Sequence, residues 1–379
     1  MAGVTPCLSR RLLASCLLGI TLLTGAAASQ AAGDKLKVYV SFGFYGNTWM
    51  EQNRNMMTAL TNSDAYKDKM TLEVQVGNGD AQRQAQQISA MTEAGADVIV
   101  LYPVSPTALN RAIKNACRQG VTVMTWDATV TEPCATNVHA DNNQQAIDEA
   151  QWIVDKLNGK GNVLMINGLN GVAASDDRVK AAKQLWSKYP GIKVIGEIEG
   201  KWSDPVVREE ISKFMAVRSW DDIDIAFTQL GCYPFYALQD EAGIADAQKV
   251  PCAGSAENAE RLALVPADTK VDGANGSYRP MGIDGYTFEI GPVMGAQALK
   301  YGVDAHLQGK ELPHDILMPV KVVTRDNVKM CSTGSYAELQ AGCNTYPPSL
   351  VPNPETSVAI YSDELPQLGL KAALTGEPE

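Results

Sequence analysis

The stretch GNGDAQRQAQQISAMTEAGADVIVLYPVSPTALNRAIKNACRQGVTVMTWDA, residues 77–128, decides the fold because two hydrophobic patterns alternate in it. Runs of mainly apolar and β-branched residues at 97–104 and 121–126 predict strands that are buried on both faces. Residues 81–95 and 107–120 carry helical spacing, and each segment ends in a glycine, as helix C-termini often do. A helix between two buried strands is typical of a βαβ unit in a parallel sheet.

The same alternation continues on both sides of this stretch. We expect strands at residues 36–42, 71–76, 97–104, 121–126, 137–142, 162–168, 192–198 and 223–229. We expect helices at residues 49–60, 81–95, 107–120, 144–157, 175–189 and 205–219. These units are too many for one sheet of ordinary size. The sequence therefore predicts an α/β protein with two lobes, each a doubly wound parallel sheet covered by helices.

Aromatic and hydrogen-bonding residues gather where the predicted strands end. Trp126 and Asp127 stand side by side at the end of the strand at 121–126, although a buried carboxylate must find partners. Similar residues follow other strands, at positions 44–49, 78–80, 104–105, 167–168, 202 and 229. Ligands of open α/β sheets bind beyond the carboxyl ends of the strands. These residues therefore predict a site for a small polar ligand.

The N-terminus reads as an export signal. Arg10 and Arg11 precede a short apolar run, and small residues follow as far as Ala31. This pattern is typical of a secretory signal peptide. We expect cleavage after Ala31, with Ala28 as the alternative, and a mature protein in the periplasm.

The cysteines agree with export. Of the eight cysteines, two leave with the signal peptide, and the remaining even number indicates disulfides in an oxidising compartment. The chain has no C-x-x-C pair and three scattered histidines, which argues against a metal site. The expected pairs are Cys117–Cys134, from the geometry of βα units, and Cys232–Cys252 and Cys331–Cys343, from proximity along the chain.

Charge and motifs exclude several classes of function. The formal net charge of −11 becomes −13 once the two arginines of the signal peptide are removed, and no basic stripe is present to neutralise phosphates. Residues 77–82 begin like a dinucleotide fingerprint, but Gln82 stands where that motif needs a small residue. The chain has no G-x-S-x-G, H-E-x-x-H or P-loop. We therefore expect that the protein binds neither nucleic acid nor a cofactor and that it is not an enzyme.

Residues 77–128 resemble the first lobe of the type I sugar-binding proteins of bacterial ABC importers, the group of the ribose-binding proteins. That family has a D-a-l-i-i-x-P strand and a G-I-P-V-V-x-x-D strand, matched here by DVIVLYP at 97–103 and GVTVMTWD at 120–127. Weaker similarity follows at residues 140–142, 291–310 and 316–323. The resemblance covers about residues 35–324. It implies the periplasmic binding protein type I fold, whose lobes are joined by a three-segment hinge.

The resemblance also implies domain boundaries and partners. The expected parts are a signal peptide at 1–31, an N-terminal lobe at 32–139 plus 290–317, a C-terminal lobe at 140–289 plus 318–335, and a C-terminal extension at 336–379. The implied function is that of a monomeric periplasmic solute-binding component. It would bind a small sugar or polyol in the cleft between its lobes and pass it to an ABC permease in the inner membrane.

Ligand-binding residues carry over from the family unevenly. The matching or substituted positions are Tyr45, Asn47, Trp49, Asp127, Asp176, Arg178, Trp202, Gln229 and Glu289. Asp176 replaces a family arginine, whereas Arg178 retains the second arginine of that segment. Losing an arginine while gaining carboxylates favours a polyol or a positively charged ligand over an ordinary pentose or hexose.

Each candidate also has a structural interpretation. Asp127 can close a turn, Asp176 can cap a helix, and Arg178 can pair with a neighbouring carboxylate. Trp49 and Trp202 can belong to the lobe cores, and Trp126 is expected to pack rather than to bind. A second function remains open as well. If Asp127 and Asp176 face each other across the cleft, they can imitate the paired carboxylates of a periplasmic carbohydrate-active enzyme.

Overall fold

Two six-stranded sheets carry the fold in the computed structural model, which describes residues 34–254, 257–288 and 290–379. The first sheet has the strand order β11-β5-β4-β3-β1-β2, and all of its strand pairs are parallel. Its strands are β1 (Leu36–Phe42), β2 (Met70–Val76), β3 (Val98–Tyr102), β4 (Thr122–Trp126), β5 (Thr136–His139) and β11 (Asp315–Leu317). The predicted signal peptide lies outside the described residues.

The second sheet repeats this arrangement in the order β12-β10-β9-β8-β6-β7, with β12 alone antiparallel to its neighbour β10. Its strands are β6 (Lys160–Asn167), β7 (Gly191–Glu199), β8 (Ile225–Thr228), β9 (Cys252–Gly254), β10 (Tyr286–Phe288) and β12 (Val322–Thr324). The chain crosses between the sheets after β5, after β10 and after β11. The predicted fold class, two doubly wound parallel-sheet lobes joined by three segments, is confirmed.

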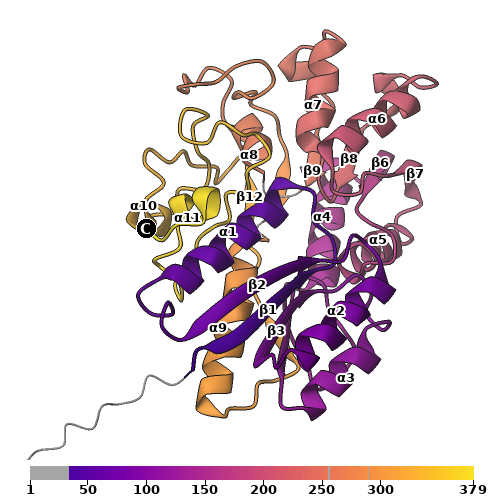
Figure 1. Ribbon diagram of the computed structural model, residues 1–379. Helices are drawn as coiled ribbons and strands as arrows, with labels where there is room; N and C mark the ends of the chain where they lie inside the picture. The colour runs from indigo at the N-terminus through magenta and orange to yellow at the C-terminus, as the bar shows by residue number, and fades with distance from the viewer. Residues whose placement is uncertain (1–33, 255–256, 289) are drawn as a thin grey trace, which may run out of the picture. The chain divides into compact units, whose positions relative to one another are not determined.

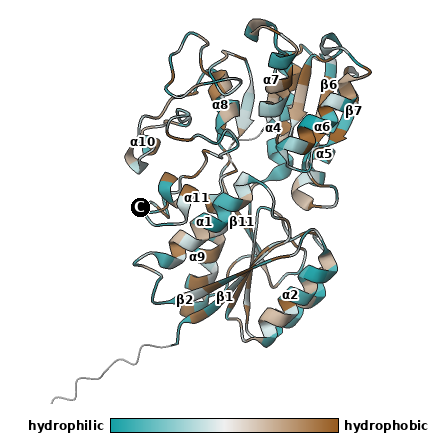
Figure 2. Cartoon of the chain, turned by 45° about the horizontal axis from the view of Figure 1, so that its top comes forward, coloured by the Kyte–Doolittle hydropathy of each residue, from teal (hydrophilic) through white to brown (hydrophobic). Residues whose placement is uncertain are grey.

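Helices pack against both faces of each sheet (Figure 1). On the first sheet, α1 (Thr48–Asn62) and α9 (Val293–Gln308) pack together on one face, and α2 (Ala81–Glu93) and α3 (Asn110–Arg118) on the other. On the second, the pairs are α4 (Asn142–Lys156) with α5 (Ala173–Trp186), and α6 (Asp204–Met215) with α7 (Cys232–Glu241). Figure 2 shows hydrophilic and hydrophobic residues together on α2 and α6, as expected for helices with one buried face.

Strand β3 shows why the apolar runs are continuous. Ile99 and Leu101 belong to the core shared with α2 and α3, whereas Val98, Val100 and Tyr102 belong to the core shared with α1 and α9. Successive side chains of a strand point to opposite faces, so a strand covered on both faces is apolar at every position.

The chain leaves β5 earlier than the pattern predicts. The strand expected at 137–142 ends at His139, and the last part of that prediction is wrong because α4 begins at Asn142. The side chain of Asp141 accepts a hydrogen bond from the backbone N–H of Gln144 at 3.0 Å and so caps the helix.

The remaining elements are short. They are the helices α8 (Asn258–Leu264), α10 (Tyr336–Gln340) and α11 (Leu370–Thr375) and the 3₁₀ turns η1 (Trp220–Asp222) and η2 (Asp246–Gln248). The residues from 336 onward pack onto the rest of the chain as part of one compact unit, Lys35–Glu379. Helix α11 packs on α1, where the Asn55 amide donates to the carbonyl of Ala373 at 3.0 Å.

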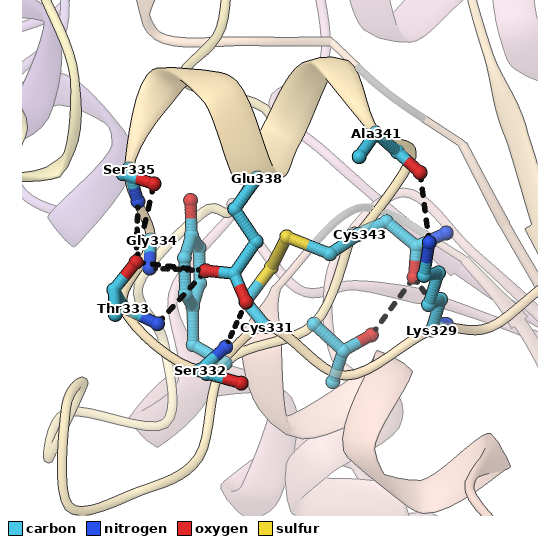
Figure 3. The surroundings of a disulfide bond; sticks show 12 residues. Lys329, Cys331, Ser332, Thr333, Gly334, Ser335, Glu338, Ala341 and Cys343 are labelled. Atoms are coloured by element: carbon cyan, nitrogen blue, oxygen red, sulfur yellow. Dashed lines mark hydrogen bonds between the residues drawn. A yellow bond between two sulfur atoms is a disulfide. The ribbon is translucent and has the colours of Figure 1, made fainter.

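The structure contains the three expected disulfides, Cys117–Cys134, Cys232–Cys252 and Cys331–Cys343. Figure 3 shows the Cys331–Cys343 bond beside Glu338, whose carboxylate accepts hydrogen bonds from the backbone N–H groups of Ser332, Thr333 and Gly334. These bonds lower the pKa of Glu338 to about 2. The disulfide and the carboxylate together fix the start of the C-terminal extension.

Among the helices of the described residues, none combines the length and the apolar character that a membrane span requires.

Candidate functional site

A cavity opens where the carboxyl ends of both sets of strands meet. Its walls comprise Asn47, Trp49, Met50, Tyr102, Asp127, Arg178, Trp202, Gln229, Leu230, Glu257, Phe288, Ile290, Glu355 and Ser357. The empty space between these walls, counted out to the mouth, is about 580 Å³. The structure brings six of the nine predicted ligand residues to this cavity: Asn47, Trp49, Asp127, Arg178, Trp202 and Gln229.

Asp127 and Arg178 form the charged centre of the cavity. Asp127 follows β4 with a left-handed backbone, φ 59°, which aspartate tolerates better than most residues. Its Oδ1 lies 3.9 Å from Nη2 of Arg178, and both side chains are under a tenth exposed. Burial raises the pKa of Asp127, while the charge of Arg178 acts to lower it.

Arg178 is held in place from two sides. Its Nε and Nη2 donate to Oδ1 of Asn142 at 2.9 and 2.7 Å. The guanidinium lies over the ring of Phe288, 5.6 Å from its centroid. A guanidinium fixed in this way is ready to donate to a ligand without losing much side-chain freedom.

Two indoles form apolar walls. Trp49, in the first turn of α1, donates from Nε1 to the carbonyl of Ile290 at 2.8 Å. Trp202 is buried and has a positive φ of 52°. Its indole lies directly on Gly168, where an added Cβ would fall 2.2 Å from Cε2 of the indole. Glycine at 168 therefore makes room for the Trp202 wall.

Asn47 and Gln229 place polar groups beside these walls. Asn47 caps α1 by accepting from the N–H of Met50 at 2.9 Å, and its amide donates to the carbonyl of Trp202 at 3.0 Å. Gln229 donates to the carbonyl of Ser175 at 3.2 Å. Its buried Oε1 has no hydrogen-bond partner among the described residues.

Two of the predicted ligand residues, Tyr45 and Asp176, do not line the cavity, and a third was predicted at a position that the structure does not describe. Tyr45 packs edge-on against Phe42, with ring centroids 5.3 Å apart. Asp176 is exposed, and both of its carboxylate oxygens accept from the N–H of Gly171 at 3.1 Å, in agreement with a local capping role. Glu289 lies outside the described residues. The carboxylate pair of Asp127 and Asp176 that an enzyme would need is therefore not formed across this cavity.

The cavity also has acidic walls that the sequence pattern did not indicate. Glu257 lies just before α8 and is 6 % exposed, whereas Glu355 and Ser357 come from the C-terminal extension. Burial, followed by the charges of Asp204, Glu260 and Glu355, raises the pKa of Glu257 well above its ordinary value. No sequence pattern indicated these residues, because they lie outside the periodic segments and reach the cavity only through tertiary contacts.

Two lobes that enclose a cavity with polar groups and aromatic walls define a ligand-binding protein. Residues 38–311, more than half of the chain, match the family described as the Periplasmic binding protein domain. The chain belongs to this family, which consists of solute-binding proteins rather than enzymes.

Similar proteins are named for sugars or polyols. The xylitol-binding protein of Mycolicibacterium smegmatis is 27% identical over 252 residues, which are 66% of this chain and 68% of that protein. A galactofuranose-binding protein of Escherichia coli is 26% identical over 204 residues, which are 52% of this chain and 63% of its own length. The crystal structure of a galactofuranose binding protein has a TM-score of 0.66 at 19% identity and covers 77% of this chain and 95% of that one. At that identity, the structural likeness shows the fold alone.

Proposed function

We propose that this protein binds one small polyhydroxylated ligand, a sugar or polyol, in the cavity and delivers it to an ABC permease. The observation that carries the proposal is the combination of indole walls with buried, unused hydrogen-bond acceptors. Oδ1 of Asp127 and Oε1 of Gln229 line the cavity and have no hydrogen-bond partner among the described residues. Leaving such a group unsatisfied costs roughly 1–3 kcal/mol. The hydroxyl groups of a sugar or polyol are donors that satisfy both.

The aromatic walls suit the rest of such a ligand. The C–H faces of a sugar ring or polyol chain are apolar and pack on the faces of Trp49 and Trp202. Arg178 donates to ligand oxygens, while Asp127 accepts from neighbouring hydroxyls with charge-assisted hydrogen bonds. Relatives named for xylitol and galactofuranose support this ligand class.

The contacts across the cavity support a closing motion around the ligand. The first lobe supplies Asn47 and Asp127, and the second supplies Trp202 and Arg178. Because both lobes contact the same space, ligand binding favours the closed arrangement of the lobes. A closed pair of lobes is the form that we propose the permease recognises.

Export to the periplasm is part of the same proposal. The three disulfides are expected of a protein from an oxidising compartment, and the sequence of residues 1–31 is typical of a signal peptide. The protein works as a monomer and needs no nucleic acid or cofactor.

Calorimetric titration of the purified mature protein with xylitol, sorbitol, myo-inositol, D-ribose, D-galactose and their amino derivatives tests the proposal. We expect one compound to bind with a stoichiometry of one and to be recovered chemically unchanged. Conversion of a bound sugar or glycoside into product would instead favour the carbohydrate-active enzyme, and failure of the whole panel to bind would contradict the proposed ligand class.

A further inference from the structure

The C-terminal extension forms part of the cavity wall. The side chain of Gln52 in α1 exchanges two hydrogen bonds with the backbone of Ser357, at 3.0 and 2.9 Å. On the other side, the N–H of Asn258 in α8 donates to the carbonyl of Thr356 at 2.8 Å. The extension thus contacts elements of both lobes and brings Glu355 into the cavity wall. This segment lies outside residues 38–311, the part of the chain that matches the family.

The charges on the cavity wall do not balance. Four charged side chains line it, and Arg178 faces Asp127 at 3.9 Å. The other two charged side chains of the wall, Glu257 and Glu355, are both acidic. Oε2 of Glu355 accepts a hydrogen bond from the hydroxyl of Thr48 at 3.1 Å. Besides burial, the groups that raise the pKa of Glu257 are the carboxylates of Asp204, Glu260 and Glu355. The cavity therefore has an acidic end near the start of α1.

The second observation is a buried acceptor without a partner. Glu257 is 6 % exposed, it lines the cavity, and its Oε2 has no hydrogen-bond partner in the part of the chain that the structure describes. Asp204, whose charge acts on Glu257, is 9 % exposed, and neither of its carboxylate oxygens has a hydrogen-bond partner among the described residues. Buried carboxylates without a partner are costly, and a cation among them removes that cost.

The geometry favours an organic cation over a metal ion. Among the described residues, Cys331, Glu338 and Cys343 are the one group of three His, Cys, Asp or Glu side chains whose ligating atoms lie within 4.8 Å of one another. Those two cysteines are joined in a disulfide and offer no thiolate. Among the described residues, no three carboxylates of the cavity wall come this close together. An ammonium group does not need three such ligands, because it can contact one or two carboxylates and an aromatic face.

We propose that the ligand carries a protonated amine, bound between Glu257 and Glu355, so that the ligand class is an amino sugar or amino polyol. This inference rests on the proposed function. Asp127, Arg178 and Gln229 bind the hydroxyl groups, and the tail contributes the selectivity for positive charge.

Matched pairs of compounds that differ in one amine test the inference. We would titrate D-glucose against D-glucosamine and D-sorbitol against its 1-amino-1-deoxy analogue, at pH 7, into the wild type and into Glu355→Gln, Glu257→Gln and Glu377→Gln. Glu377 is the control, because it belongs to the same tail but its side chain is 69% exposed and pairs with Lys371. We expect the amine of at least one pair to bind ten or more times more tightly, and this preference to fall at least tenfold in Glu355→Gln and Glu257→Gln but not in Glu377→Gln.

The failures of the two proposals are distinguishable. If the neutral member of a pair binds as tightly as the amine, the inference is wrong and the proposed function stands. The inference is also wrong if both Glu355→Gln and Glu257→Gln keep the preference for the amine. It is wrong as well if CaCl₂ stabilises the wild type and Glu355→Gln abolishes this effect, because the site would then bind a metal ion. If neither neutral nor aminated compounds bind, the proposed function itself is contradicted. Because the wild-type comparison needs no variant, a folding defect in one variant does not remove the test.

Discussion

Asp127 and Arg178 face each other across the cavity from different lobes, with Oδ1 and Nη2 3.9 Å apart. This distance is too long for a hydrogen bond, so the pair does not use up the hydrogen-bonding capacity of either side chain. Arg178 is held instead by Asn142, while Oδ1 of Asp127 has no hydrogen-bond partner among the described residues. A ligand oxygen bearing a proton can bond to both groups at once. We therefore propose that Asp127 ends its strand to bind a ligand.

The fluorescence of Trp49 should report binding. Its indole lines the cavity and is half-buried, so a ligand packed on it changes its environment. Trp49→Ala should weaken binding by one to a few kcal/mol, from lost stacking of roughly 0.5–1.5 kcal/mol and lost burial. A fluorescence titration of the wild type measures the first effect. Calorimetric titration of Trp49→Ala, beside melting curves of the ligand-free proteins, measures the second. Unchanged affinity would assign Trp49 to the lobe core.

Gly168→Ala should displace the Trp202 indole, although Gly168 itself does not line the cavity. The new Cβ would overlap the Trp202 indole, whose nearest ring atom lies 2.2 Å away, so the wall has to move. We expect a loss of affinity of at least tenfold, about 1.4 kcal/mol. Gly46→Ala is the matched control, because its new Cβ meets nothing closer than 3.6 Å. Equal affinity in both variants would show that the position of Trp202 does not matter for binding.

Asp204 should make the stability of the ligand-free protein depend on pH. Burial, followed by the charges of Glu355 and Glu260, raises its pKa from 3.8 to about 8. The folded chain then keeps a proton that the unfolded chain loses, so the contribution of Asp204 is fully present below about pH 4 and is lost as the pH rises towards 8. Denaturant unfolding of wild type and Asp204→Asn at pH 5, 6.5 and 8 isolates this effect. The stability gained by Asn over Asp should grow with pH, and a constant difference would mean that Asp204 titrates normally.

Local pattern predicted the fold because each βαβ unit is encoded within a short stretch, as residues 77–128 show. The family resemblance then led to Asp127, Arg178 and Trp202, whose positions follow from strand ends and helix starts. Tyr45 and Asp176 occupy equivalent places, but a local contact holds each of them: the ring of Phe42 for Tyr45 and the N–H of Gly171 for Asp176. Sequence position does not reveal which way such a side chain turns.

The acidic wall was not predictable for a different reason. Glu257 and Glu355 are far apart in sequence, and they come together because the backbones of Glu257 and Ser357 form an antiparallel bridge. Neither residue belongs to a periodic segment whose pattern would suggest such a contact. Pairing between distant irregular segments depends on the whole tertiary structure, and single-sequence patterns carry no information about it.

The most direct test of the account is a calorimetric titration of Asp127→Asn with whichever sugar, polyol or amino derivative binds the wild type. The variant keeps the shape of the side chain but loses its charge and part of its acceptor capacity, and charge-assisted bonds are worth roughly 1.5–3 kcal/mol each. We expect at least a tenfold loss of affinity for Asp127→Asn. Asp176→Asn should bind normally, because Asp176 lies outside the cavity wall and asparagine caps nearly as well. Normal affinity in Asp127→Asn, or an equal loss in Asp176→Asn, would contradict the site described here.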